Sequence, residues 1–336
     1  MKQVLAIFLP ICFCHYLASC DEVYPKKADR YSNLFLKTTP RPQRQMGFIV
    51  DPKINSTQLS GTNVEAIKAA LVEHGVVVLR NQNLTRKQQM ELTEALGVVV
   101  KLPRFLAVKD VEPGFENQIL RVTNYDSKGK LKDPAQANGQ YWHKDGDYYQ
   151  NDYIGTVLYA DQIGRGNVRP TLFLDNCVMG IYPQDLWGEV EDFVNAIDIS
   201  QIEDFVVRDD DLKEFPAALH PLDYKHPGDG RSCTYLTQPI ATAKETDVAL
   251  ESCSDHIPKS IATEPDNQQL SNNTKEILMK LWSIMLERSP RYEHHWREGD
   301  VLIWDNSAVM HRTGLIDKSA PESSGKRILY RTQYFI

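Results

Sequence analysis

The first regular pattern of apolar and polar positions begins after residue 60 and is that of an amphipathic helix followed by a buried strand. Thr62 or Asn63 is a suitable N-cap for the helix, and Gly75 is a suitable end. The apolar positions in between fall on one helical face: Ile67, Ala70 and Leu71. The apolar run over residues 76–79 has the length of a buried strand.

A second helix is predicted soon after this strand. Thr85 and Gln88 have the spacing of a capping box, in which each side chain bonds the backbone N–H of the other residue. Gly97 is a suitable end for this helix. The folded region is therefore expected to begin with a helix, a strand and a helix.

From about residue 140 onward the pattern changes to short runs typical of strands. The clearest candidates are residues 154–159, 171–174, 301–304 and 327–335. Residues 180–270 are helix-and-loop sequence, and residues 275–287 form an amphipathic helix. Strand-rich segments on both sides of a helical insert at about 180–290 predict a mainly β fold with flanking helices. We expect a double-stranded β-helix, a jelly-roll barrel of the cupin-like type.

The first 60 residues differ from the rest of the chain. The basic Lys2, an apolar run and small residues before Cys20 are typical of a secretory signal peptide over residues 1–20. Residues 21–60 predict an extended arm or linker, which leaves a folded domain over residues 61–336. This pattern predicts a protein of the secretory pathway or the cell exterior. The alternatives are a lipid anchor at Cys20 and a cytoplasmic protein with a buried first element.

The cysteines set a limit on covalent cross-linking. Loss of the first 20 residues leaves Cys177, Cys233 and Cys253. An odd number argues against a fold built on a disulfide framework. A single bridge between Cys233 and Cys253 and buried free thiols are both compatible with this pattern.

Composition restricts the class of partner. The chain of 336 residues carries a formal net charge of −7, whereas nucleic-acid-binding domains present a basic face. No stretch reaches the roughly 18 apolar residues that a bilayer crossing requires. The predicted partner is a small molecule, with no nucleic acid and no integral membrane span.

A His-x-Asp pair at His143 and Asp145 is the first candidate for chemistry. On a strand, residues two apart point to the same face, but such a pair alone occurs by chance in many proteins. His311 is the best candidate for a third ligand. Two imidazoles and one carboxylate on one side of a metal leave positions open for a co-substrate and O₂, as in non-haem Fe(II) oxygenases. A structural zinc site would have four ligands, usually with thiolates, and the chain has no Cys-x-x-Cys pair.

The last predicted strand carries Arg327 and Arg331, which are four residues apart and therefore share a face. Guanidinium groups directed into a protein interior need anions opposite them, and arginine binds carboxylates through two parallel hydrogen bonds. The pair predicts an anion site. The alternative is a surface strand with two solvated arginines.

These motifs resemble those of the taurine dioxygenase (TauD/TfdA-like) family of Fe(II)/2-oxoglutarate-dependent dioxygenases, over roughly residues 63–336. Trp142-His143-x-Asp145 is similar to the proximal ligand motif of that family. Trp304-Asp305-Asn306, followed by His311, is similar to its distal histidine motif. The resemblance implies that His143, Asp145 and His311 are the metal ligands and the catalytic centre.

The resemblance also implies two anion-binding roles. Thr171 and Arg327 are expected to bind the co-substrate 2-oxoglutarate, and Arg331 is expected to bind an anionic substrate. The chain departs from the family pattern before Thr171, where Gly166-Asn167-Val168-Arg169-Pro170 replaces the usual Gly-Gly-Asp.

The implied activity is that of an oxidoreductase. It consumes O₂ and 2-oxoglutarate at Fe(II), releases succinate and CO₂, and hydroxylates a small anionic organic substrate, with ascorbate as an activator. The carboxylate of Asp145 favours hydroxylation, because halogenating relatives carry a small residue in its place. Desaturation is a related outcome. The alternative from another class is a catalytically inactive secreted binding module, which predicts decay of the ligand set.

Several residues near the motifs have more ordinary interpretations. Trp142 either lines the substrate pocket or is a packed core aromatic. Lys144 is expected on the face opposite the ligands, and the adjacent pair His294 and His295 is expected at the surface.

Overall fold

A computed structural model describes most of the region after residue 45. The described residues are 46–50, 61–107, 110–126, 130, 139, 142–150, 154–164, 169–178, 181–190, 194–197, 199–201, 206–236, 261–263, 272–314 and 327–336. All of them belong to one compact unit of the chain, residues 37–336. The predicted signal peptide, most of the predicted arm and Cys253 lie outside the described residues.

The described elements are mostly strands. The strands are β1 (Phe48–Val50), β2 (Val76–Leu79), β3 (Val98–Val99), β4 (Leu120–Thr123), β5 (Ile154–Gln162), β6 (Thr171–Asp175), β7 (Val194–Ile197), β8 (Ala218–Pro221), β9 (Asp223–Lys225), β10 (Ser232–Thr234), β11 (Ile261–Thr263), β12 (Arg291–His294), β13 (Val301–Asp305), β14 (Val309–Thr313) and β15 (Ile328–Phe335). The helices are α1 (Gly61–His74), α2 (Arg86–Leu96), α3 (Arg104–Ala107), α4 (Gln184–Trp187), the 3₁₀-helix η5 (Ile199–Gln201), α5 (Asp209–Glu214) and α7 (Asn272–Arg288). None of the described helices combines the length and apolar character needed to cross a membrane.

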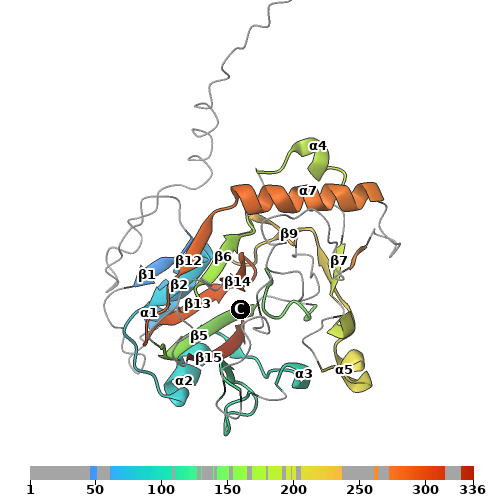
Figure 1. The fold of residues 1–336 in the computed structure, drawn as a ribbon. Helices are drawn as coiled ribbons and strands as arrows, with labels where there is room; N and C mark the ends of the chain where they lie inside the picture. Colours follow the sequence, from blue (N-terminus) through green and yellow to red (C-terminus); the bar gives the residue numbers. More distant parts are fainter. Residues whose placement is uncertain are drawn as a thin grey trace, which may run out of the picture. The chain divides into compact units, whose positions relative to one another are not determined.

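The larger sheet has the order β1-β2-β13-β5-β15-β3, with β4 paired to β15. Figure 1 shows β1, β2, β13, β5 and β15 of this sheet. β1 and β2 are parallel, and β13 pairs antiparallel with both β2 and β5. Every residue of β2 and β13 is buried, which explains their uninterrupted apolar sequences. Helix α1 contacts β2 and β13, and α2 contacts β15.

A smaller sheet, β12-β6-β14, packs against the larger one. Phe173 and Val309 of the smaller sheet share a hydrophobic core with Val78, Leu158 and Trp304 of the larger sheet. On its other side the smaller sheet contacts helix α7 through a second core, which contains Leu174, Met310, Leu281, Trp282 and Met285. This arrangement confirms a mainly β fold with flanking helices.

The helix and strand predictions agree well with these boundaries. Thr85 caps α2, and its capping box with Gln88 is formed in both directions. Helix α1 ends at His74, and Gly75 adopts a φ of +70°, which favours glycine. The expectation of helix and loop only over residues 180–270 was incomplete, because the short strands β7 to β11 lie there. Their three or four residues are too few to show a clear alternation, and their partners decide their conformation.

Two sequence expectations are corrected by the structure. Cys233 forms its disulfide with Cys177, not with Cys253, because the end of β6 meets β10 where Thr234 N donates to Asn176 O at 2.9 Å. His294 is fully buried, with its Nε2 3.1 Å from Asp300 Oδ2, whereas His295 is exposed as expected. Alternation along β12 sends the two histidines to opposite faces, and only one face is solvated.

Candidate metal centre

The two candidate histidines are brought together by backbone pairing. His143 and His311 form an isolated antiparallel bridge, in which His143 N donates to His311 O at 3.0 Å and His311 N donates to His143 O at 2.9 Å. Residues directly opposite each other in such a pair point to the same side. The ring centroids are accordingly 4.3 Å apart.

Asp145 completes the cluster from the turn that follows His143. One ligand atom from each of His143, Asp145 and His311 lies within 4.8 Å of the other two. Asp145 occupies a turn rather than a strand, and Gly146 after it has a φ of +79°. The predicted convergence of the three side chains is present. It arises from a bridge and a tight turn rather than from simple alternation along a strand.

Three residues hold Asp145 in place. Thr156 Oγ1 donates to Asp145 Oδ2 at 2.9 Å, and Arg331 Nη1 donates to Oδ1 at 2.8 Å. The backbone N–H of Asp145 donates to Asn306 Oδ1 at 3.0 Å. Burial by itself raises the pKa of Asp145, but the charges of Arg331 and the two histidines and the Thr156 hydrogen bond outweigh it and lower the pKa. The carboxylate is therefore ionised at neutral pH.

His311 has the protonation state of a metal ligand. Burial, together with the nearby His143, lowers its pKa to about 3, so that the imidazole is neutral at physiological pH. Its ring packs on Phe173 and Trp304, with centroid separations of 5.9 Å and 4.7 Å. Its Nδ1 is buried and has no hydrogen-bond partner within the described part of the chain.

The space beside His143 is kept open by Gly139. A Cβ at this position would lie 3.2 Å from His143 Cε1 and 3.7 Å from Thr313 Oγ1. Gly139 also has a φ of +75°, which disfavours other residues. The cluster thus offers two imidazoles, of which that of His311 is neutral, and one ionised carboxylate, a donor set that fits a divalent first-row metal.

The two arginines differ in their surroundings. Arg331 pairs with Asp145, while its Nε has no hydrogen-bond partner among the described residues. Arg327 Nε is buried and is likewise without a partner in that part of the chain. Burial and the positive charge of nearby Arg169 lower the pKa of Arg327 to about 10. Neither arginine is the solvated surface residue of the alternative interpretation.

The residues on either side of His143 point away from the cluster. Trp142 is buried in the core that contains α7, with the Arg312 guanidinium 5.2 Å from its ring centroid. This position favours the interpretation of Trp142 as a packed core aromatic. Lys144 is buried between two tyrosines: its Nζ donates to Tyr224 Oη at 2.8 Å and lies 4.2 Å from the Tyr235 ring centroid. Lys144 therefore faces away from the ligands, as predicted.

The sequence analysis did not identify the roles of Thr156 and Asn306, which hydrogen-bond to Asp145. Thr156 is a polar residue in an otherwise apolar buried stretch of β5, and that contrast was an available signal. Asn306 was identified only as part of the motif that precedes His311, but its amide oxygen also accepts from the backbone N–H of Asp145. The role of such residues depends on partners about 150 positions away, which one sequence does not reveal.

Comparisons with known proteins agree with this geometry. The profile described as "Taurine catabolism dioxygenase TauD, TfdA family" matches residues 39–333. The alpha-ketoglutarate-dependent 2,4-dichlorophenoxyacetate dioxygenase of Cupriavidus pinatubonensis is 24% identical over 78% of this chain and 86% of its own length. The (S)-phenoxypropionate/alpha-ketoglutarate-dioxygenase of Sphingobium herbicidovorans is 23% identical over 80% of this chain and 84% of its own length.

Solved structures show the same fold. AAD-2, in complex with Mn(II) and N-oxalylglycine, has a TM-score of 0.65 at 18% identity and covers 88% of this chain and 97% of its own. A taurine dioxygenase from Burkholderia xenovorans has a TM-score of 0.60 at 18% identity and covers 89% of this chain and 90% of its own. Because the family profile spans most of the sequence, the chain belongs to the TauD, TfdA family of dioxygenases.

Proposed function

We propose that His143, Asp145 and His311 hold the Fe(II) of a 2-oxoglutarate-dependent dioxygenase that hydroxylates a small anionic organic substrate. The observation that carries the proposal is the convergence of these three side chains within 4.8 Å in a member of this family. The bound metal supplies the position at which O₂ is reduced while 2-oxoglutarate is decarboxylated to succinate and CO₂. The protein supplies the buried ligands and their orientation.

The proposed fold of the domain over residues 61–336 is a double-stranded β-helix of the jelly-roll type. Support comes from the face-to-face packing of the two sheets and from the similarity to AAD-2. In such a barrel the inward-facing side chains of both sheets surround one cavity. The cluster then lies between the two sheets. His143 pairs with His311 on β14 of the smaller sheet, and Arg331 on β15 of the larger sheet donates to Asp145.

Thr171 and Arg327 are the proposed anchors of 2-oxoglutarate. Arg169 is close enough to Arg327 for its positive charge, together with burial, to lower the pKa of Arg327. The two guanidinium groups form a positive site that an anion stabilises. The far carboxylate of 2-oxoglutarate is such an anion, and arginine binds carboxylates through paired hydrogen bonds. Arg169 lies two residues before Thr171, and its charge acts on Arg327, which supports a shared ligand for Thr171 and Arg327.

Arg331 is the proposed contact for the anionic group of the substrate. Its Nη1 is committed to Asp145, but its Nε is buried and has no hydrogen-bond partner in the described structure. The relatives from Cupriavidus and Sphingobium have names that denote carboxylate substrates. A small carboxylate or sulfonate bound at Arg331 would lie beside the metal. A purely structural ion pair with Asp145 is the competing role for this arginine.

An inactive binding module is not favoured. Such a protein has no need of a ligand set, yet the three ligands converge and Asp145 is held from three directions. Desaturation remains a competing product type, because it follows from the same metal centre.

We also propose that the protein is exported, with residues 1–20 as a cleaved signal peptide. The buried Cys177–Cys233 disulfide supports this, because disulfides persist mainly in oxidising compartments. The intact mass of the secreted protein should correspond to a chain that lacks residues 1–20. A mature chain that retains Met1, or that carries a lipid on Cys20, would replace the proposal by one of its alternatives.

The activity is tested with purified protein, Fe(II), 2-oxoglutarate and ascorbate. Under anaerobic conditions the wild-type protein should show a weak visible charge-transfer band, and Asp145→Ala should lose it. In air, a panel of aryloxy- and alkyl-carboxylates and sulfonates is screened for substrate-dependent succinate release, with mass spectrometry of the product. A mass increase of one oxygen indicates hydroxylation, whereas loss of two hydrogens indicates desaturation.

The substrate role of Arg331 needs a separate readout. Arg331→Gln should raise the KM for the anionic substrate and leave the KM for 2-oxoglutarate almost unchanged. An equal loss of affinity for both compounds would instead indicate that Arg331 acts only through Asp145.

A further inference from the structure

The hydroxyl of Thr171 has one well-defined neighbour in the protein. Trp296 Nε1 donates a hydrogen bond to Thr171 Oγ1 at 3.0 Å, and both side chains are buried. Within the described structure, no other hydrogen bond to this hydroxyl is recorded. The direction of this bond follows from chemistry, because an indole N–H can only donate.

The direction of that bond determines which further hydrogen bonds the Thr171 hydroxyl can form. A threonine hydroxyl has one hydrogen to donate and two lone pairs to accept with. Because Trp296 occupies a lone pair, the remaining hydrogen is free to point at a further acceptor. A hydroxyl in this state is a better donor to an anion than an unbound one, since hydrogen bonds in a chain polarise each other.

Thr171 lies on the face of the smaller sheet that carries His311. In the smaller sheet Thr171 pairs in register with Thr313, two residues after His311. Thr313 Oγ1 and His143 Cε1 both border the space left by the missing side chain of Gly139. Thr171 therefore lies on the same face as the proposed metal ligand His311, one strand away.

Trp296 is itself held firmly. Its ring meets His294 edge to face, with centroids 4.5 Å apart and an interplanar angle of 87°. His294 lies between Tyr292 Oη, 3.2 Å from its Nδ1, and Asp300 Oδ2, 3.1 Å from its Nε2. Asp300 is paired in turn with Arg80. This chain of contacts fixes the indole orientation before any ligand binds.

We propose that Trp296 is a positioning residue for the co-substrate: its indole N–H fixes the Thr171 hydroxyl as a donor to a carboxylate oxygen of 2-oxoglutarate. This inference rests on the proposed function and deepens it. The site is specific for an acceptor, because a ligand with a donor at this point would meet the Thr171 hydrogen. Trp296 acts through Thr171 and does not touch the ligand.

The test is a double-mutant cycle read by ligand binding. The dissociation constant of 2-oxoglutarate is measured by anaerobic calorimetry and by the charge-transfer band of the Fe(II) protein. Thr171→Val should weaken binding by about ten- to a hundredfold, because it removes a hydrogen bond to a charged group. Trp296→Phe should weaken binding by roughly three- to tenfold, because the hydroxyl remains but loses its orientation. In the Thr171→Val background Trp296→Phe should have almost no further effect.

Three comparisons separate positioning from general damage. Trp282→Phe removes another buried indole, in the α7 core, and should leave 2-oxoglutarate affinity unchanged. Thr171→Ser keeps the hydroxyl and should bind within a fewfold of wild type. Trp296→Tyr serves as a second variant without the indole N–H if the phenylalanine variant does not fold, with folding checked by thermal unfolding.

The outcomes are distinct. If the wild-type Fe(II) protein does not bind 2-oxoglutarate saturably, the proposed function itself fails. If the wild type binds but folded Trp296→Phe binds equally well, the inference about Trp296 is overturned. The same holds if Trp296→Phe weakens binding as strongly in the Thr171→Val background as in the wild type.

Discussion

Asp305, the last residue of β13, and Asn306, the first residue of the turn to β14, bond to different neighbours. The carboxylate of Asp305 meets the hairpin of β9 and β10, on what we call the outer side of the turn, where Oδ2 lies 2.9 Å from His226 Nε2 and Oδ1 accepts from the backbone N–H of Ser307. The amide of Asn306 faces the metal cluster, where Oδ1 accepts from Asp145 N and Nδ2 donates to Thr156 Oγ1 at 3.0 Å. Both side chains are almost fully buried.

The difference shows how chemistry selects each residue type. A buried carboxylate needs a partner of opposite charge or several donors, and Asp305 has His226 and Ser307. At position 306 a carboxylate would repel Asp145 and compete for a metal. A neutral amide avoids both effects, and it accepts and donates at once. One turn therefore separates a buried contact between Asp305 and His226 from the hydrogen bonds that support the proposed ligand Asp145.

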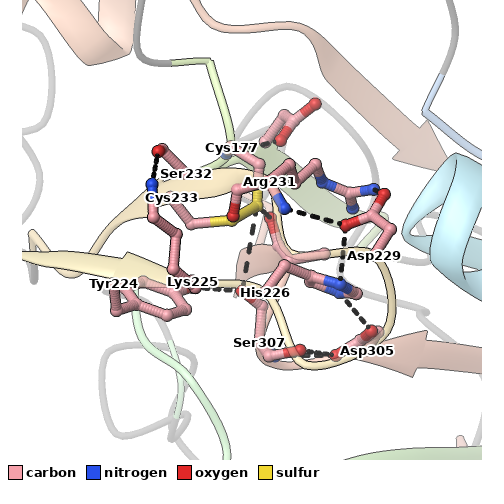
Figure 2. The surroundings of a disulfide bond; sticks show 12 residues. Cys177, Tyr224, Lys225, His226, Asp229, Arg231, Ser232, Cys233, Asp305 and Ser307 are labelled. Carbon is pink, nitrogen blue, oxygen red and sulfur yellow. Dashed lines mark hydrogen bonds and ion pairs between the residues drawn. A yellow bond between two sulfur atoms is a disulfide. The ribbon is translucent and has the colours of Figure 1, made fainter.

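A disulfide bond lies next to the outer side of this turn. Figure 2 shows His226 between Asp229 and Asp305, next to the disulfide that joins Cys177 to Cys233. Cys177 Sγ lies 3.8 Å from the carbonyl oxygen of Ala308. The hairpin of β9 and β10 is thereby fixed against the turn that precedes His311. We expect substitutions on the outer side to change stability and those on the inner side to change metal binding.

The largest expected effect is on the inner side, at Asp145 itself. Asp145→Ala should reduce bound iron and succinate release by more than the roughly 100-fold that loss of an outer-shell partner causes. The reason is that it removes the anionic ligand and also leaves Arg331 without its partner. Metal content and turnover are measured on protein shown to be folded by circular dichroism. Retention of full iron content would contradict the ligand assignment.

The next effect is on the outer side, at the disulfide. Replacement of Cys177 and Cys233 by serine should lower the free energy of unfolding by about 4 kcal/mol, because the bond closes a loop across a sequence separation of 56. Urea unfolding of the two proteins gives the difference. In conditions where the variant is folded, its iron affinity should stay close to that of the wild type. A selective loss of iron would show that the disulfide acts on the metal side.

Asp305→Asn should cost about 3 kcal/mol at neutral pH, because it leaves buried His226 without its charged partner. Burial alone raises the pKa of Asp305, but hydrogen bonds from His226 and Ser307 outweigh it, so that the pKa is below the usual 3.8. The contribution of a group with a lowered pKa is complete above the unfolded-state pKa and is lost as the pH falls through the folded-state value.

The difference in unfolding free energy between wild type and Asp305→Asn should therefore be smaller below pH 3.8 than at neutral pH. Urea titrations at a series of pH values measure it. A difference that grows on acidification would mean that the carboxylate is protonated in the folded protein.

The smallest of these effects is expected at Asn306. Asn306→Ala should weaken iron affinity by roughly 10- to 100-fold, since it removes the acceptor of the Asp145 backbone N–H and a donor to Thr156. Iron affinity is measured by competition with a chelator. The matched comparison is Asp305→Asn, one residue away. If both variants lose iron affinity equally, the division of the turn into two sides is wrong.

Features that depend on local pattern or on residue type could be predicted from the amino-acid sequence. The Thr85 capping box and the buried run of β13 can be predicted from spacing, because helices and strands impose fixed periods on buried positions. Of the two arginines assigned to the last strand, only Arg331 lies on β15, because the strand begins at Ile328 and its register shifts between Ile328 and Leu329. The ligand set of His143, Asp145 and His311 could be selected because few residue types bind iron, and the comparisons then supported the family.

Contacts between groups that are distant in the sequence became known from the three-dimensional fold alone. The Cys177–Cys233 pairing, the burial of His294 and the bond between Trp296 and Thr171 depend on how β6, β12 and the hairpin of β9 and β10 are brought together. A single sequence records the chemistry of each side chain but not its long-range neighbours. For polar residues the neighbours decide the role, because a buried polar group is stable only beside a partner that satisfies it.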